Sequence, residues 1–227
     1  TAALAASGRS VVVLDDLSTG TADRVPDGVT LIEGDVGDAA VVGAALHDHG
    51  VTAVIHIAAK KQVGESVARP LWYYRQNVTA MATLLECCVD AGVDRFLFSS
   101  SAATYGMATD GLISEDTPAQ PINPYGESKL IGEWLLADVA RSAGLSYAAL
   151  RYFNVFGPGQ DPHAEYAAVV PRFITAARDA RRPVIYGDGH QSRDFIHVDD
   201  VVAANLLAAD VPGLAGATVN IGSGVRS

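Results

Sequence analysis

Short apolar runs that end in polar residues recur along the chain, and longer stretches with helical spacing separate them. Apolar runs of this length are typical of parallel strands that are buried on both faces. They predict strands at residues 11–14, 31–32, 53–59, 95–100, 146–153 and 217–221. The stretches between them predict helices at residues 39–49, 77–91, 125–143 and 171–180. This alternation predicts an α/β fold with a Rossmann-like, doubly wound parallel sheet, which binds ligands at the carboxyl ends of its strands.

The beginning and end of the sequence depart from the usual dinucleotide-binding pattern. Residues 1–8 have the character of a helix end that leads into the first predicted strand. A strand and a glycine-rich turn normally precede such a helix, and no G-x-G-x-x-G occurs anywhere in the sequence. We therefore expect a fragment of a longer protein, whose sheet lacks its first strand and whose substrate-binding lobe is small and incomplete. The expected regions are an NAD-binding domain at 1–155 and, at 156–227, a mixed segment that contributes the substrate lobe and the last strand of the sheet.

The composition narrows the classes of function. Apolar residues make up 49% and charged residues 19% of the 227 positions, as in globular proteins, and no apolar run approaches the roughly 18 residues of a membrane span. The formal net charge of −10 argues against a nucleic acid or an anionic membrane as a partner. The adjacent Cys87 and Cys88 predict reduced thiols in a cytoplasmic protein. The histidines share no helical face with carboxylates, so no metal site is expected.

An acidic residue ends the first predicted strand. Asp15 occupies the tip of what would be the second strand of a Rossmann unit, where a carboxylate accepts hydrogen bonds from the adenosine ribose and repels a 2′-phosphate. No arginine follows it in residues 16–20, which favours NAD over NADP as the cofactor. A strand-end aspartate that caps the next turn is the alternative explanation.

Tyr125 and Lys129 lie four residues apart at the start of a predicted helix, directly after Pro124. Their side chains therefore rise on one helical face. An unperturbed tyrosine has a pKa of about 10, and a nearby ammonium group together with a nicotinamide cation would lower that pKa toward working pH. The serines at 99–101 end the preceding strand, where a hydroxyl can hold the substrate oxygen. These residues predict an acid–base site, and an ordinary surface pair is the alternative.

Several segments carry a resemblance to a known family. They are LDDLSTG (14–20), EGDVGD (33–38), VIHIAAKKQVGES (54–66), YYRQNV (73–78), FLFSSSAATYG (96–106), PYGESK (124–129), LRYFNVFGPGQDP (150–162) and YGDGHQSRDFIHVDDV (186–201). With them the sequence resembles the extended short-chain dehydrogenase/reductases, in the NAD-dependent epimerase/dehydratase family, and most closely the UDP-hexose 4-epimerases of that family. The segments follow the family order and cover nearly the whole chain.

The resemblance implies a role for each matching residue. It implies that Ser101, Tyr125 and Lys129 are catalytic. It implies NAD contacts at Asp15, Asp16, Ser18, Thr19, Gly20, Asp35, Val36, Ala58, Ala59, Lys61, Asn77, Ser99, Tyr125, Lys129 and Phe153. It implies contacts with a UDP-sugar at Ser101, Asn154, Ala168, Val169, Phe173, Tyr186 and Arg193. In this set, Asn154 and Arg193 would bind the diphosphate.

The activity implied by the resemblance is inversion of carbon 4 of a UDP-hexose, plain or N-acetylated, through a 4-keto intermediate. A 4,6-dehydratase or decarboxylase of the same family is one alternative. Those relatives carry an acidic residue just after the strand-end Ser or Thr, where this chain has none in residues 101–105. A non-catalytic NAD-sensing protein, or a truncated fragment without activity, is the other alternative. The family also implies a homodimer through the helices at 77–91 and 125–143, although packing in the core explains their apolar residues equally well.

Overall fold

The computed structural model describes residues 1–107, 111–160, 169–185, 187–211 and 216–225. Its strands are β1 (Val12–Asp15), β2 (Thr30–Glu33), β3 (Ala53–His56), β4 (Arg95–Ser101), β5 (Ser146–Tyr152), β6 (Asn154–Phe156), β7 (Phe195–His197) and β8 (Ala217–Ile221). Its α-helices are α1 (Ala2–Ala6), α2 (Ala39–Asp48), α3 (Val63–Ala68), α4 (Pro70–Tyr74), α5 (Ala80–Asp90), α6 (Pro124–Ala143), α7 (Val169–Arg178) and α8 (Val198–Asp210). Short 3₁₀-helices cover Ala22–Arg24 and Ala102–Tyr105, and a π-helix covers Arg75–Thr79.

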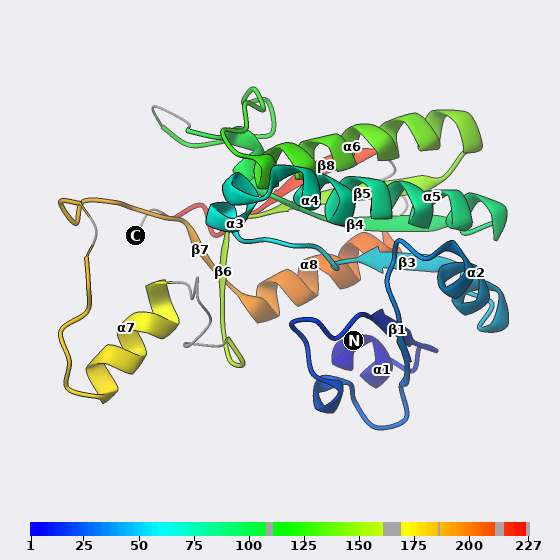
Figure 1. Ribbon diagram of the computed structural model, residues 1–227, viewed down its shortest axis with the longest axis horizontal. Helices are drawn as coiled ribbons and strands as arrows, with labels where there is room; N and C mark the ends of the chain where they lie inside the picture. Colours follow the sequence, from blue (N-terminus) through cyan, green and yellow to red (C-terminus); the bar gives the residue numbers. More distant parts are fainter. Residues whose placement is uncertain (108–110, 161–168, 186, 212–215, 226–227) are drawn as a thin grey trace.

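All strand pairs between the described residues are parallel. Strands β3, β4, β5 and β8 form a four-stranded sheet in that order, while β1 pairs with β2 and β6 pairs with β7. Helices α5 and α6 lie over one face of the four-stranded sheet and α8 lies over the other (Figure 1). This arrangement confirms the predicted Rossmann-like α/β class. Within the described part of the chain, no strand hydrogen bonds join β1 and β2 to the four-stranded sheet.

The main apolar core lies between the four-stranded sheet and helices α2, α5 and α6. Phe96 of β4, Met81 and Leu85 of α5, and Leu136 of α6 are at most 2% exposed. Burying a side chain of this size contributes about 1.5–3 kcal/mol, so these contacts hold α6 firmly against β4. A smaller cluster around Leu97 packs α8 on the opposite face.

Both ends of α6 have clear sequence causes. Asn123 caps its start, because the side-chain oxygen accepts the Gly126 N–H at 2.9 Å. Pro124 is its first residue, where no backbone N–H is needed. Gly144 ends the helix with a φ of 74°, in the left-handed region that favours glycine. The helix predicted at 125–143 is thus confirmed.

Some elements differ from the prediction. Helices α3 and α4 lie in a stretch where Gly64 and Pro70 interrupt the helical pattern, yet Pro70 begins α4 because it is tolerated in a first turn. The strand predicted at 53–59 ends at His56, and the residues that follow form a loop. Helix α8 was not predicted; the His197 side chain caps it by accepting a backbone N–H at 3.3 Å.

Candidate active site

Three serines end β4, and each has a different partner. The Ser99 hydroxyl shares a hydrogen bond of 3.1 Å with the Tyr152 hydroxyl of β5. The Ser100 hydroxyl donates to Glu133 of α6 at 2.5 Å. The Ser101 hydroxyl accepts a backbone N–H of the following turn at 3.2 Å. The chain therefore uses this strand end to connect β4 with both the neighbouring strand and α6.

Tyr125 and Lys129 lie in the first two turns of α6 and contact the same strand end. The Lys129 ammonium donates to the Ser99 carbonyl oxygen at 2.8 Å. The Ser101 side chain interacts with the Tyr125 hydroxyl and by itself lowers the pKa of Tyr125. The structure thus brings together the three residues that the sequence singles out as catalytic.

Burial governs the protonation of both α6 side chains. It raises the pKa of Tyr125, and the interaction with Ser101 opposes this rise. It lowers the pKa of Lys129 to about 8. The expected lowering of the Tyr125 pKa by Lys129 is not among the causes of its shift, and the Lys129 ammonium donates to the Ser99 carbonyl oxygen. Tyr125 is therefore a proton donor at neutral pH and needs a further cation nearby to act as a base.

His56 ends β3 beside this pair and is fully enclosed. Its ring stacks on Phe98 with centroids 6.0 Å apart, and the Lys129 ammonium lies 4.9 Å from the Phe98 centroid. Burial, and to a smaller extent the charge of Lys129, lower the pKa of His56 to about 3. His56 is a neutral core residue at physiological pH.

Asn77 joins the loop after β3 to α6. Its side-chain oxygen accepts the Lys60 N–H at 2.8 Å, and its amide donates to the Lys60 carbonyl at 2.8 Å and to Ser128 at 3.0 Å. Ser128 in turn donates to the Tyr125 carbonyl oxygen at 2.7 Å. Asn77 lies within the π-helix, a local irregularity that is frequent at functional sites. Its side chain therefore positions the loop and the helix, and the direct contact with NAD stays a prediction.

Asp15 ends β1 as predicted and serves the turn that follows. One carboxylate oxygen, Oδ1, accepts the Leu17 N–H at 2.8 Å, so the capping explanation is correct for that atom. Among the described residues, none donates a hydrogen bond to Oδ2. A carboxylate with one available oxygen beside an exposed turn fits the hydroxyl groups of an adenosine ribose, which NAD would present.

Lys60 was not predicted as a site residue, although its neighbour Lys61 was. The Lys60 ammonium reaches the β1 loop, where it donates to Ser18 at 2.5 Å and pairs with Asp16 at 3.5 Å. The pKa of Asp16 is lowered, first by its hydrogen bond with Ser18 and to a smaller extent by Lys60. Lys61 is exposed. Because Lys60 and Lys61 are adjacent in a loop, the sequence pattern does not predict which of them contacts the residues after β1.

The other predicted cofactor residues lie on loops after β1, β2 and β3. Those that are exposed are Thr19, Asp35 and Ala58, and those that are half-buried are Gly20, Val36 and Ala59. These three loops follow the carboxyl ends of parallel strands, where the fold class predicts a ligand.

The predicted diphosphate residues lie on β6 and just before β7. The Asn154 amide donates to the Asp194 carbonyl at 2.9 Å, and exposed Arg193 donates to the Ser192 carbonyl at 2.8 Å. Asn154 thus contacts the residue that follows Arg193. Phe153, half-buried, donates its backbone N–H to β8 at 3.0 Å.

The predicted residues of the nucleotide pocket are only partly described. Val169 and Phe173 are 40% and 39% exposed on α7, which lies away from the four-stranded sheet (Figure 1). Ala168 and Tyr186 lie outside the described residues. Among the described residues, no hydrogen bond or ion pair joins Val169 or Phe173 to Asn154 or Arg193, so their common role stays a prediction.

Asp194 was not predicted, and it ties the β6–β7 pair to the end of β8. Its carboxylate accepts the Ser223 N–H at 2.8 Å, the Ser223 hydroxyl at 2.7 Å and the Gly224 N–H at 2.8 Å. The partners of Asp194 are about thirty positions away along the chain, so a local sequence pattern does not reveal them. The only feature of the sequence that points to Asp194 is its position next to Arg193.

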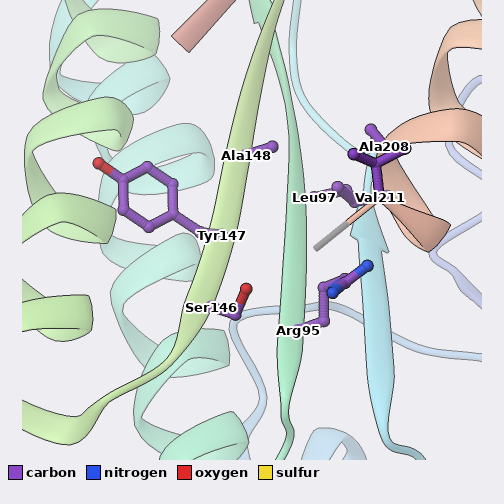
Figure 2. Close-up of a pocket in the computed structure, with 7 residues that line it drawn as sticks. All are labelled: Arg95, Leu97, Ser146, Tyr147, Ala148, Ala208 and Val211. Carbon is purple, nitrogen blue, oxygen red and sulfur yellow. The ribbon is translucent and has the colours of Figure 1, made fainter. Parts of the chain in front are cut away.

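A hollow at the other end of the sheet is a poor alternative site. Figure 2 shows side chains around the amino ends of β4 and β5 and the end of α8: Arg95, Leu97, Ser146, Tyr147, Ala148, Ala208 and Val211. The Arg95 guanidinium is engaged there by the Ala209 carbonyl oxygen. Elsewhere in the described ranges, no three His, Cys, Asp or Glu side chains gather as a metal site requires, and no helix has the length and apolar character to cross a membrane.

Known proteins similar to this chain in sequence and fold include UDP-glucose 4-epimerases and a dTDP-glucose 4,6-dehydratase of Streptomyces venezuelae, the latter with a TM-score of 0.88 at 32% identity and coverage of 100% of this chain and 71% of its own. The chain is 43% identical over 220 residues to UDP-glucose 4-epimerase of Azospirillum brasilense, a match that covers 91% of this chain and 63% of that protein. UDP-glucose 4-epimerase of Thermotoga maritima, solved with UDP-glucose, superposes with a TM-score of 0.95 at 35% identity and covers 100% of this chain and 73% of its own. The enzyme of Brucella ovis, solved with NAD, gives 0.91 at 38% identity, with coverage of 100% and 74%.

The chain therefore spans a little under two thirds of the length of the Azospirillum relative. The family model for the NAD-dependent epimerase/dehydratase family matches residues 1–222. With a strand-end serine, a tyrosine and a buried lysine at the carboxyl end of a parallel sheet, the chain belongs to the NAD-dependent epimerase/dehydratase family.

Proposed function

We propose that the chain carries the catalytic and UDP-sugar-binding residues of an NAD-dependent epimerase that inverts carbon 4 of a UDP-hexose. The observation that carries the proposal is the contact between Tyr125 and Ser101 at the end of β4, beside buried Lys129. The 43% identity to a UDP-glucose 4-epimerase supports the reaction and the substrate class.

The three catalytic residues have separate tasks. Ser101 would hold the oxygen on carbon 4 by a hydrogen bond. Tyr125 would take the proton of that hydroxyl group when the sugar is oxidised and return it when the sugar is reduced. Lys129 supplies a positive charge one helical turn away, which favours the phenolate form of Tyr125 once its ammonium is free to turn. NAD, when bound, supplies hydride acceptance from carbon 4 and hydride return to the opposite face of the 4-keto sugar.

Residues of both lobes would bind the two ligands. The available oxygen of Asp15 would accept hydrogen bonds from the adenosine ribose of NAD. Arg193 would pair with the UDP diphosphate, since a guanidinium group matches phosphate oxygens in geometry and charge. The Asn154 amide, which donates to the carbonyl of the residue after Arg193, would donate to the same group.

We also propose a homodimer through α5 and α6. Their exposed apolar side chains, Val89 at 41% and Trp134 at 59% exposure, support a contact on this face. The chain's two cysteines are free, which supports a reducing, cytoplasmic location.

A direct assay tests the proposed function. The 227-residue chain is incubated with NAD and either UDP-glucose or UDP-N-acetylglucosamine, and the 4-epimer is measured by chromatography. We expect one or both to be converted. Conversion of neither, with a 6-deoxy-4-keto product formed from a dTDP-sugar, would replace the epimerase proposal by a dehydratase.

Two controls make the assay specific. Tyr125→Phe should abolish conversion but leave NAD binding in equilibrium dialysis largely intact, because only the reacting hydroxyl is removed. Unchanged conversion by this variant would remove Tyr125 from its proposed role. Failure of the parent chain to retain NAD would show that this polypeptide is not active by itself.

A further inference from the structure

A row of three polar side chains crosses the four-stranded sheet beneath α6. Ser100 of β4 is in register with Arg151 of β5, and Arg151 is in register with Asn220 of β8. Neighbouring residues in register on parallel strands present their side chains to the same face of the sheet. We call Ser100, Arg151 and Asn220 the polar row. Ser100 and Arg151 are buried, at 2% and 7% exposure.

Glu133 and Tyr105 complete this row. The Glu133 carboxylate accepts the Ser100 hydroxyl at 2.5 Å, the Arg151 Nε–H at 2.9 Å and an Arg151 Nη2–H at 2.6 Å. The Tyr105 ring lies 4.6 Å from the guanidinium carbon, and its hydroxyl donates to Asn220 at 2.7 Å. Every member of the polar row is therefore bound, and α6 is joined to β4 and β5 by one carboxylate.

The position of Glu133 relates it to the catalytic residues. Tyr125, Lys129 and Glu133 are spaced four residues apart, so they lie along one stripe of α6. The partner of Glu133 on β4, Ser100, lies between the serine whose carbonyl receives Lys129 and the serine that contacts Tyr125. Next to Glu133, Gly132 lets the helix approach closely, since a Cβ there would lie 2.7 Å from the Phe98 ring.

Stability alone is a weak reason for a buried ion pair. Taking both charges out of water costs much of what their attraction returns, and well-packed apolar residues often serve as well. The pair of Glu133 and Arg151 also fixes the geometry between α6 and β5. We propose that Glu133 is a positioning residue: through Arg151 and the polar row it sets the depth of α6, and so the approach of Tyr125 to Ser101. The proposal rests on the proposed function for its catalytic meaning, but its geometry can be tested separately.

Fluorine NMR provides the test. The protein is labelled with 3-fluorotyrosine, and the Tyr125 signal is assigned by its loss in Tyr125→Phe. Three proteins are compared with the parent: Glu133→Gln, the double variant Glu133→Met/Arg151→Met, and Asp138→Asn. Asp138 is the matched control, because it pairs with Arg141 on the exposed side of the same helix.

We expect Glu133→Gln to lower the melting temperature, because it leaves the Arg151 charge buried without a partner. The double variant should regain much of that loss and remain folded. In both variants the Tyr125 signal should move, whereas in Asp138→Asn it should not. If the parent chain epimerises, both should also lose kcat by about a hundredfold, as for a small misplacement of a reacting group, with KM within about twofold.

The double variant shows whether Glu133 positions Tyr125 or only stabilises the fold. A Tyr125 signal and kcat that return to parent values together with the melting temperature would overturn the proposal, because the pair would then be replaceable packing. A parent chain without turnover would refute the proposed function for this polypeptide and leave the fluorine result to decide on Glu133.

Discussion

The two halves of the candidate site are built differently. At the end of β4, Tyr125 and Lys129 already have protein partners, and Lys129 is buried while Tyr125 is half-buried. On the lobe formed by β6, β7 and α7, Arg193 and Phe173 are exposed, and Arg193 is bound only to a neighbouring carbonyl group among the described residues. The proposed catalytic side chains thus have fixed protein partners, whereas the side chains proposed to bind the UDP-sugar are exposed.

Because of this difference in burial, substitutions in the two halves should have different effects on stability and activity. Enclosed side chains interact strongly because water does not screen them, so changing them affects kcat, pKa values and stability. Exposed side chains lose little on substitution in the free protein and reveal their role only when the ligand is present. Substitutions in each half should therefore give distinct signatures.

The largest expected effect is on catalysis at Lys129. Lys129→Met should reduce kcat by about 100- to 10,000-fold, the range for removing a group that supports acid–base transfer. The melting temperature should stay or rise, because burying an ammonium group opposes folding, as its lowered pKa of about 8 shows. Steady-state kinetics and thermal unfolding measure both. A variant that loses stability but keeps its kcat would reverse our assignment of this residue.

The next effect concerns pH and His56. Its folded pKa of about 3 lies below the ordinary 6.5, so from pH 6.5 downward the unfolded chain binds a proton that the folded chain does not. Stability should therefore fall on acidification, by about 1.4 kcal/mol per pH unit. In His56→Leu, the free energy of unfolding, measured by urea titration, should depend less steeply on pH below 6.5. Near pH 7 the pH dependence of the variant and of the parent should differ least. An unchanged acid slope would contradict the enclosed, neutral state of His56.

A smaller effect is expected in the lobe, at Arg193. Arg193→Met should raise the KM for the UDP-sugar by about 10- to 100-fold, because a hydrogen bond to a charged group contributes about 1.5–3 kcal/mol. Its melting temperature should not change, since the side chain is exposed. Arg141→Met, at an exposed position on α6, is the control and should leave KM unaltered. Equal KM values in both variants would mean that the lobe does not bind the diphosphate through Arg193.

The smallest effect is expected at the ion pair between Asp16 and Lys60. Asp16→Asn should change the free energy of unfolding by about 0.5 kcal/mol, and high salt should remove the difference, because the pair is partly exposed. Urea titrations at low and high salt measure it. A decrease of several kcal/mol in the free energy of unfolding would show that the contact between Asp16 and Lys60 is as strong as those of buried side chains.

The catalytic half was predictable from sequence because its signals are local. An apolar run that ends in serines marks β4, and the spacing of Tyr125 and Lys129 on a helix after Pro124 places both on one face. The direction of the Tyr125 pKa was not predictable, since it depends on burial.

The side-chain contacts between elements could not be predicted from the sequence, because they also depend on how the elements pack. Glu133 meets Arg151 only because α6 and β5 pack with a particular depth and register, and no periodicity encodes that distance. Asp194 meets Ser223 after the chain has passed through α8 and β8. Short strands such as β6 carry too few residues for an apolar run to mark them.

The separation of β1 and β2 from the four-stranded sheet has a consequence for local unfolding. Two strands alone are marginally stable, and β1–β2 relies on packing with α2 rather than on backbone hydrogen bonds to β3. Its amide protons should therefore exchange with deuterium earlier than those of β4 and β5. Asp15 is the last residue of β1, so if it contacts NAD as proposed, the rate of deuterium uptake in β1 should fall when NAD is added, a measure that needs no turnover.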